Sequence, residues 1–344
     1  MEAINLRGAA MRVLLTLLFC LAALPLWAQC AGNDLLARMP PAQRAALDQM
    51  ADAHPYPNGI LWRATKGDQV VHLVGTMHFH EPRHGATMSQ IAPWIEGATT
   101  VFLELGEGDE ARLQRDIATN PSLAFLTEGP SLLEMMDPAD WDRLTAAMRQ
   151  RGVPGFMAAK MQPWMALMTL SATKCVIEGV RAGKRGLDQM IIERAKELGN
   201  PARALEDHDT VLDIFGLFSQ DEMIEFLTLF LRMENFEPDD QHKTLVEAYF
   251  REEIRVIWEF ALVQALAEPQ GLSEAEILAD YARLEDALIG ARNRGWMDRI
   301  LPAAEAGPVL VAAGALHLPG EQGLLRLLER QGFQVERVPR RISE

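Results

Sequence analysis

Two histidines, one near each end of the chain, follow the same local pattern. His78 closes the segment VVHLVGTMH and His317 closes PVLVAAGALH, and in each segment a glycine lies three residues before the histidine. The apolar run before each glycine is typical of a buried strand, and the glycine lets the chain turn where the strand ends. Ligands of open parallel sheets bind beyond the carboxyl ends of the strands. We therefore expect both histidines at one rim of a sheet.

A carboxylate is expected at the same rim. Glu104 lies near the end of TTVFLEL, residues 99–105, which is typical of another buried strand. Two imidazoles and one carboxylate are suitable ligands for a divalent first-row metal ion, and they would leave positions open for water and substrate. Water bound to such an ion loses a proton more readily and becomes a nucleophile at neutral pH. Glu104 could instead be the general base that accepts this proton, and the sequence leaves both roles open.

Three further side chains are candidates for the rim. His80 extends the first motif into HFHEPRH. Strand alternation would place it on the same side as His78, although the proline and the polar residues favour a loop. We retain His80 as an optional additional metal ligand. Asp188 in GLD and Glu206 in ALE are either rim residues or helix caps and surface groups.

An arginine and an asparagine precede the second motif. Arg292 and Asn293 lie on a predicted helix shortly before the strand that leads to His317. A guanidinium near the site could stabilise developing negative charge or bind a substrate carboxylate. The alternative is a surface ion pair with Glu285 or Asp286. We place the arginine and the asparagine among the candidate catalytic residues.

The elements that must position these residues form an α/β pattern. Predicted helices fill the middle of the chain, and the predicted strands are residues 61–65, 69–75, 99–105, 201–206, 308–313 and 333–338. The apolar runs at 164–180 and 239–267 indicate two long helices. We predict a mostly parallel central sheet with flanking helices. Residues 31–344 are expected to form a single domain, with a helical insertion or cap at about 125–180 and 210–285.

The N-terminal segment has the layout of a secretory signal peptide. Arg7 and Arg12 precede the apolar run VLLTLLFCLAALPLW, so residues 1 to about 30 are predicted to be a signal peptide cleaved somewhere in 28–31, and the mature protein is expected to be periplasmic or secreted. Cys30 follows LWAQ, a weak match to a lipid-attachment motif. A lipid on Cys30 is the one route to membrane association that we infer from the sequence. Cys30 could instead form a disulfide with Cys175 in an oxidising compartment.

Charge and composition narrow the range of partners. The chain has 344 residues, a hydrophobic fraction of 49% and a formal net charge of −15 at pH 7. This length and apolar content are sufficient for a full core. A nucleic-acid partner is not expected, because binding would require a concentrated basic face.

Several short motifs, taken in order, resemble the TraB/GumN family, which includes the Tiki metalloproteases. The matching segments between about residues 58 and 338 are GTMH, VFLEL, the PW of MQPW, GLD, LE, RN and GALHLPGEQGLLRLLERQGFQVERV. The resemblance implies an α/β fold related to erythromycin esterase-like and haem-binding ChaN-like proteins. Its Tiki branch implies a divalent-metal-dependent peptidase with manganese or cobalt, and zinc is a further option. The residues carried over are His78, Glu104 and His317 as the metal and catalytic group, with Arg292 and Asn293 as the RN pair.

The leading hypothesis from the sequence is an exported, metal-dependent hydrolase of the bacterial envelope. It would be a Tiki-like peptidase that acts on a peptide or protein segment reaching the rim of the sheet. The alternative is a non-catalytic periplasmic protein of the same fold that binds haem, a metal ion or a peptide. A structural role in envelope polysaccharide export would rest on a family name alone.

Overall fold

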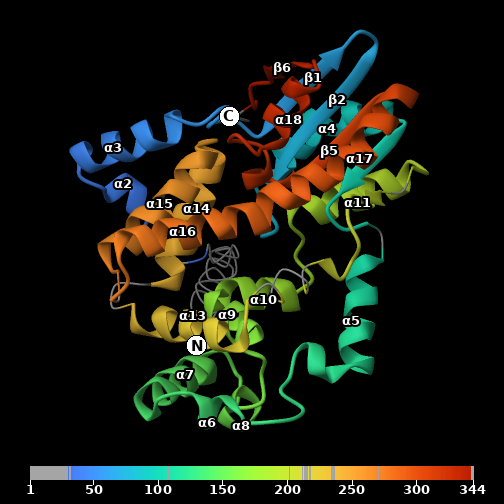
Figure 1. The fold of residues 1–344 in the computed structure, drawn as a ribbon. Coiled ribbons are helices and arrows are strands. Elements are labelled where there is room, and N and C mark those ends of the chain that lie inside the picture. The colour runs from blue at the N-terminus through green and yellow to red at the C-terminus, as the bar shows by residue number, and fades with distance from the viewer. Residues whose placement is uncertain are drawn as a thin grey trace, which may run out of the picture.

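A six-stranded mixed sheet has the strand order β4-β3-β5-β2-β1-β6 and lies toward the upper right of Figure 1, above a group of helices. The computed structural model describes residues 30, 32–106, 108–200, 202–210, 212, 216, 218–233, 237–269 and 271–341. The strands are β1 (Leu61–Lys66), β2 (Gln69–Thr76), β3 (Thr100–Leu103), β4 (Arg203–Ala204), β5 (Val309–Gly314) and β6 (Gln334–Arg337).

The four strands from β4 to β2 run parallel, and β1 is antiparallel to both of its neighbours. The predicted α/β class with a mostly parallel sheet is confirmed. Strand β5 lies between β2 and β3, where Thr76 pairs with Gly314 and Leu103 pairs with Ala312. This register makes the three strands end at nearly the same level. The turns that follow them therefore emerge side by side at one rim.

Alternation along the central strands divides their side chains between two hydrophobic layers. On one face, Leu310 and Ala312 pack with residues of α4 (His84–Gly97), α11 (Leu187–Glu197) and α14 (Pro238–Phe250). On the other face, Val309 and Val311 pack with α17 (Ala291–Ala306) and α18 (Leu324–Arg330). Both faces of β5 are buried, which explains why its sequence is continuously apolar.

Other helices form a separate group on one side of the sheet (Figure 1). A further hydrophobic core there joins α7 (Pro138–Gln150), α9 (Pro163–Ser171) and α13 (Gln220–Arg232), with Leu144, Leu170 and Leu227 among its buried residues. The remaining helices are α2 (Leu35–Arg38), α3 (Pro41–Asp52), α5 (Asp109–Thr119), α6 (Leu132–Met135), α8 (Gly155–Ala158), α10 (Lys174–Arg181), α15 (Ile254–Ala267) and α16 (Glu274–Glu285). The division into one domain with a helical cap stays a prediction.

Both of the long helices predicted from apolar runs are in fact broken. The run at 164–180 divides into α9 and α10, because the hydroxyl of Thr173 accepts a hydrogen bond from the N–H of Val176 and begins a new helix. The run at 239–267 divides into α14 and α15 at Glu252, which has a φ of 64°. The carbonyl of Glu252 accepts a hydrogen bond from the N–H of Gly59 at 2.8 Å. Local caps and distant contacts therefore override the apolar pattern.

A disulfide joins the beginning of the described chain to α10. Cys30 and Cys175 are bonded, with their Cα atoms 5.4 Å apart. A sulfur in a disulfide cannot also carry a thioether-linked lipid, so this pairing favours the disulfide over lipid attachment at Cys30. The predicted signal peptide at 1–30 otherwise lies outside the described residues. Within the described ranges, no helix is long and apolar enough to cross a bilayer.

The disulfide should stabilise the fold measurably. The two cysteines are 145 residues apart in sequence. Closing a loop of this length restricts the unfolded chain, so Cys175→Ser should lower the free energy of unfolding by about 2–5 kcal/mol in urea titrations. A reductant should destabilise the wild type and leave the variant unchanged. Intact mass of the purified protein would contradict the pairing if it showed two free thiols or a lipid on Cys30.

Candidate functional site

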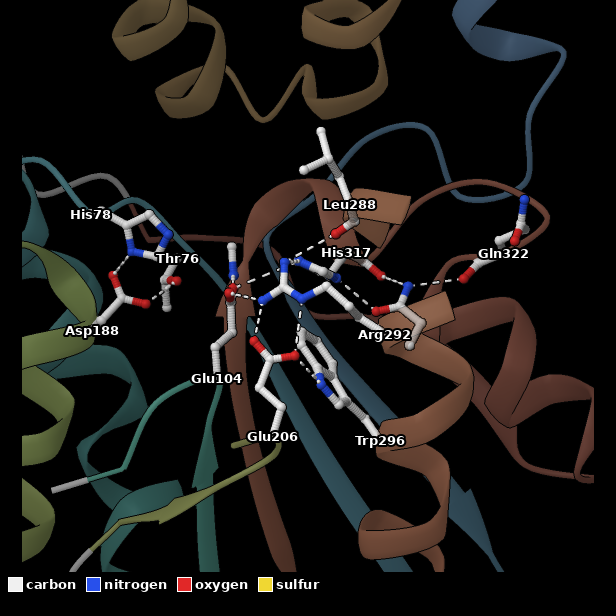
Figure 2. A network of polar contacts seen from close by, with 12 residues as sticks. Thr76, His78, Glu104, Asp188, Glu206, Leu288, Arg292, Trp296, His317 and Gln322 are labelled. Carbon is white, nitrogen blue, oxygen red and sulfur yellow. Dashed lines mark hydrogen bonds and ion pairs between the residues drawn. The ribbon is translucent and has the colours of Figure 1, made fainter. Parts of the chain in front are cut away.

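The rim brings the three principal candidates together around Gly314, where β5 ends (Figure 2). A methyl group added to Gly314 would lie 3.2 Å from Oε1 of Glu104, 3.7 Å from Nε2 of His78 and 3.8 Å from Cδ2 of His317. The three side chains therefore converge on one point although they are up to 239 residues apart in sequence (78 to 317). The parallel register of β2, β5 and β3 produces this convergence.

Asp188 orients the His78 ring. The Nδ1 of His78 lies 2.9 Å from one carboxylate oxygen of Asp188, and the hydroxyl of Thr76 donates to the other oxygen at 2.5 Å. Asp188 lies in the first turn of α11, and the helix starts against the His78 turn because the N–H of Leu187 donates to the carbonyl of Met77. Since a carboxylate accepts, Nδ1 of His78 carries a proton. The other ring nitrogen, Nε2, is then the atom presented toward Gly314.

The close approach of these two segments requires a glycine. A side chain at Gly186 would place its first carbon 2.2 Å from the carbonyl oxygen of His78. Such a contact is sterically forbidden, and the obstacle is backbone that cannot rotate away. The glycine of the GLD motif therefore lets α11 begin where Asp188 can reach the histidine.

The two histidines have opposite protonation preferences. The negative charge of Asp188 raises the pKa of His78 to about 9 despite partial desolvation, and Glu104 adds to this effect. The His78 side chain is 64% exposed, so it is accessible from solvent. Burial lowers the pKa of His317 to about 4, and the positive charge of Arg292 opposes protonation further. At neutral pH His78 is therefore a cation and His317 is neutral.

Asn293 fixes the tautomer of His317. The Asn293 amide nitrogen donates to the carbonyls of His317 at 3.0 Å and Gln322 at 2.8 Å. Its amide oxygen must then face Nδ1 of His317, 2.7 Å away, and this nitrogen must carry the proton. Asn293 is fully buried, so the arrangement is protected from water. Nε2 of His317 is left as an acceptor and faces Arg292 at 3.2 Å.

Glu104 is an ionised acceptor at the centre of the group. Its Oε1 accepts from the N–H of Gly314 at 2.6 Å, and its Oε2 accepts from Nη2 of Arg292 at 2.7 Å. Burial alone would raise the pKa of Glu104, but the neighbouring histidines, Arg292 and the Gly314 N–H favour the charged form. Together they lower the pKa to about 2. The carboxylate therefore has no proton at any physiological pH.

Arg292 lies between two carboxylates. Beside its bond to Glu104, the guanidinium donates to both oxygens of Glu206, at 2.9 and 2.5 Å, and to the carbonyl of Leu288 at 3.0 Å. Trp296, one helical turn later on α17, donates from its indole nitrogen to Glu206 at 2.9 Å. The Trp296 ring also lies against the His317 ring, with centroids 4.4 Å apart. These contacts fix the guanidinium at the rim.

The sequence-predicted residues can now be placed. Asp188 and Glu206 are rim residues, and Arg292 pairs with rim carboxylates and not with Glu285 or Asp286. Those two acidic residues pair with Arg255 and Arg294 instead. His80 lies outside the convergent group, because it is exposed and its Nδ1 contacts the carbonyl of Arg185 at 3.2 Å.

Sequence reasoning missed Thr76 and Trp296. The four-residue spacing between Arg292 and Trp296 places both on one face of a helix and could have indicated the second residue. No comparable signal marked Thr76, because its role depends on the position of Asp188, which is 112 residues away.

The expected ligands suit a divalent ion in kind, but their arrangement does not match a metal centre. Across the described ranges, no group of three or more His, Cys, Asp and Glu side chains could hold a metal ion. Arg292 donates to Glu104 and faces the acceptor nitrogen of His317, so a positive guanidinium engages two of the three expected ligands. Metal binding here stays a prediction.

The sequence of the chain is similar to those of known proteins. The sequence profile described as the TraB/PrgY/gumN family matches residues 60–337. The chain belongs to this family. The resemblance seen in the motifs is thereby confirmed.

Two relatives are similar to this chain over most of its length. The proteins from Escherichia coli strain K12 and Shigella flexneri, both described as uncharacterized protein YbaP, are each 24% identical over 266 residues. The similarity covers 76% of this chain and 89% of each relative. No solved structure matches the chain.

The two histidines should titrate in separate pH ranges. In the metal-free protein we expect the His78 ring to lose its proton near pH 9 and the His317 ring to gain one only near pH 4, as measured by NMR. Asp188→Asn should lower the His78 pKa, because it removes the main charge that favours the imidazolium.

The same shift predicts how stability depends on pH. The pKa of His78 is raised from 6.5 to about 9 in the folded state. The ion pair therefore stabilises the fold below pH 6.5, and this contribution disappears as the pH rises through about 9. Urea titrations should show this loss in the wild type and not in Asp188→Asn. Titration of His78 near pH 6.5 in both proteins would contradict the assignment.

Proposed function

We propose that the protein is an exported hydrolase, and more specifically a peptidase that cleaves peptide segments reaching the rim of the sheet. One observation carries this proposal: an ionised carboxylate, Glu104, and a protonated imidazole, His78, converge on the same point at Gly314. Two titratable groups whose pKa values are driven apart by their surroundings are the usual signature of an acid and base pair. A neighbouring cation, Arg292, completes the set.

The residues can share the steps of amide hydrolysis. Glu104 would orient a water molecule and accept its proton while the water oxygen attacks the substrate carbonyl carbon. The negative charge that develops on the carbonyl oxygen would be stabilised by Arg292 and by the Nε2–H of His78. His78 would then donate this proton to the leaving amine as the C–N bond breaks. Exchange with water would return Glu104 and His78 to their starting states.

The proposed location agrees with the chemistry of the chain. Two arginines precede the apolar N-terminal run, and the disulfide between Cys30 and Cys175 is typical of an oxidising compartment. A net charge of −15 favours a peptide or protein substrate over nucleic acid.

A metal-dependent form of the same reaction is a second candidate. It is supported by the residue types, because the two imidazoles of His78 and His317 and the carboxylate of Glu104 suit a divalent ion in kind, although their arrangement in this structure does not match a metal centre. A bound divalent ion would activate water as a Lewis acid. Arg292 would then have to release Glu104 and His317.

Single substitutions of the proposed acid and of the proposed base should strongly reduce cleavage. We expect Glu104→Gln and His78→Gln each to lower kcat/KM by about 10²–10⁴-fold, the usual contribution of general acid and base groups. The assay is cleavage of a peptide library by the purified mature protein, read by mass spectrometry. His54→Gln is the control, because His54 lies outside the convergent group and its Nε2 contacts Glu259 at 3.2 Å. An active Glu104→Gln variant, or equal loss in the control, would overturn the proposal.

Gly314→Ala should block the same site without unfolding the protein. Gly314 has ordinary backbone angles, with φ −46° and ψ 134°, so alanine causes no backbone strain. Its methyl group would occupy the point between Glu104 and His78 where the reacting water would lie. We expect cleavage to be lost while the circular dichroism spectrum and the cooperative thermal transition are retained. Gly295→Ala is the control, since nothing lies within 4 Å of its added carbon.

Metal analysis separates the two candidates. The metal-dependent form requires a stoichiometric ion in the wild type that is lost in both His78→Ala and His317→Ala. Chelation should then abolish cleavage by the wild type, and manganese, cobalt or zinc should restore it. The acid and base form requires cleavage that survives chelation. Peptide or haem binding without any cleavage would replace both by the non-catalytic alternative.

A further inference from the structure

A largely apolar pocket adjoins His78. Its lining includes Phe79 of the loop after β2, Val176 and Gly179 of α10, and the Cys30–Cys175 disulfide, together with the charged residues Glu81 and Lys184. The pocket encloses about 100 Å³. One water molecule needs roughly 10–15 Å³ on such a measure, so there is room for several non-hydrogen atoms. His78 itself lines the pocket, so the pocket adjoins the proposed reaction site.

The loop that forms one wall is firmly held. Phe79 packs edge to face against His242 of α14, with ring centroids 5.0 Å apart. The carbonyl of Phe79 lies 3.0 Å from Nε2 of His84, whose side chain is buried. The pocket is therefore a built feature of the fold with an aromatic wall.

The opposite wall is formed by α10, where apolar side chains are left partly or largely exposed among the described residues. Helix α10 contains no fully buried residue, and its Val180 is 69% exposed although it also lines the pocket. Val176 of the same helix is only half-buried. Exposed apolar groups that line a concave site mark a place where a ligand is bound.

We propose that this pocket is a specificity subsite that binds a branched aliphatic or aromatic side chain of the peptide substrate, next to the bond that is cleaved. The inference rests on the proposed peptidase function and adds its substrate class. Valine, phenylalanine and disulfide surfaces favour an apolar group, and the pocket's position beside His78 places that group next to the leaving amine. The disulfide fixes α10 as one wall, so it also maintains the shape of the subsite.

Filling the pocket tests the proposal. A methyl group at Gly179 would lie 3.7 Å from Cδ of Lys184, which is ordinary contact, so a larger side chain can be introduced on this helix. We expect wild-type protein to cleave peptides with Leu or Phe at the residue that supplies the leaving amine at least tenfold better than matched peptides with Ala at that residue. Gly179→Leu should reduce this ratio of kcat/KM values to near unity.

Gly295→Leu is the matched control, because it adds the same side chain to a helical glycine with open space around it. This control should retain the wild-type ratio. Cleavage without preference for Leu or Phe, or an unchanged ratio in Gly179→Leu, would overturn the subsite while leaving the peptidase function intact.

If no peptide is cleaved at all, the proposed function fails and the pocket is tested by binding. N-acetyl-leucinamide, titrated into the protein, should then shift the methyl NMR signals of Val176 and Val180 in the wild type and not in Gly179→Leu. N-acetyl-alaninamide should produce a much weaker shift. Equal shifts with both amides, or none, would overturn the inference.

Discussion

The structure of the rim depends on the pairing of one half-buried cation, Arg292, with the carboxylates of Glu104 and Glu206. Removing one partner would leave the remaining charge without compensation in a site that water reaches only in part. Glu104 follows β3, Glu206 follows β4 and Arg292 belongs to α17. The guanidinium therefore determines how α17 sits over the ends of two strands, and it holds Glu104 where the turns after β2 and β5 can meet it.

The same constraint explains why two similar motifs give histidines with different properties. Each histidine follows a strand and a glycine, but their partners differ. His78 is accessible and has a carboxylate behind it, which favours a proton on the ring. His317 is buried between Asn293 and Arg292, and a second positive charge beside the guanidinium would be unfavourable. The surroundings, and not the motif, divide the roles of proton donor and neutral acceptor.

The sequence was informative where a local pattern decides the outcome. Apolar runs identified the central strands, and the two glycine–histidine spacings and the strand-end glutamate identified three residues that the fold brings together. Contacts between segments that are distant in sequence were harder to predict. The sequence left two interpretations open for Asp188 and Glu206, rim residues or helix caps and surface groups, because their partners depend on strand order and helix placement. The helix breaks at Thr173 and Glu252 were missed, since an apolar pattern does not reveal caps or long-range contacts. The sequence did not decide whether Cys30 and Cys175 form a disulfide, because the presence of two cysteines does not show that they are close in space.

The position of β5 in the sheet has a consequence for biosynthesis. This strand is fifth of six in sequence but lies between β2 and β3, which come much earlier. Until residues 309–314 have been made, β2 and β3 have no common neighbour, and Glu104 lacks the Gly314 N–H that holds it. A nascent or shortened chain that lacks β5 therefore cannot assemble the rim. Because of this topology, the rim can form only after nearly all of the protein has been synthesised.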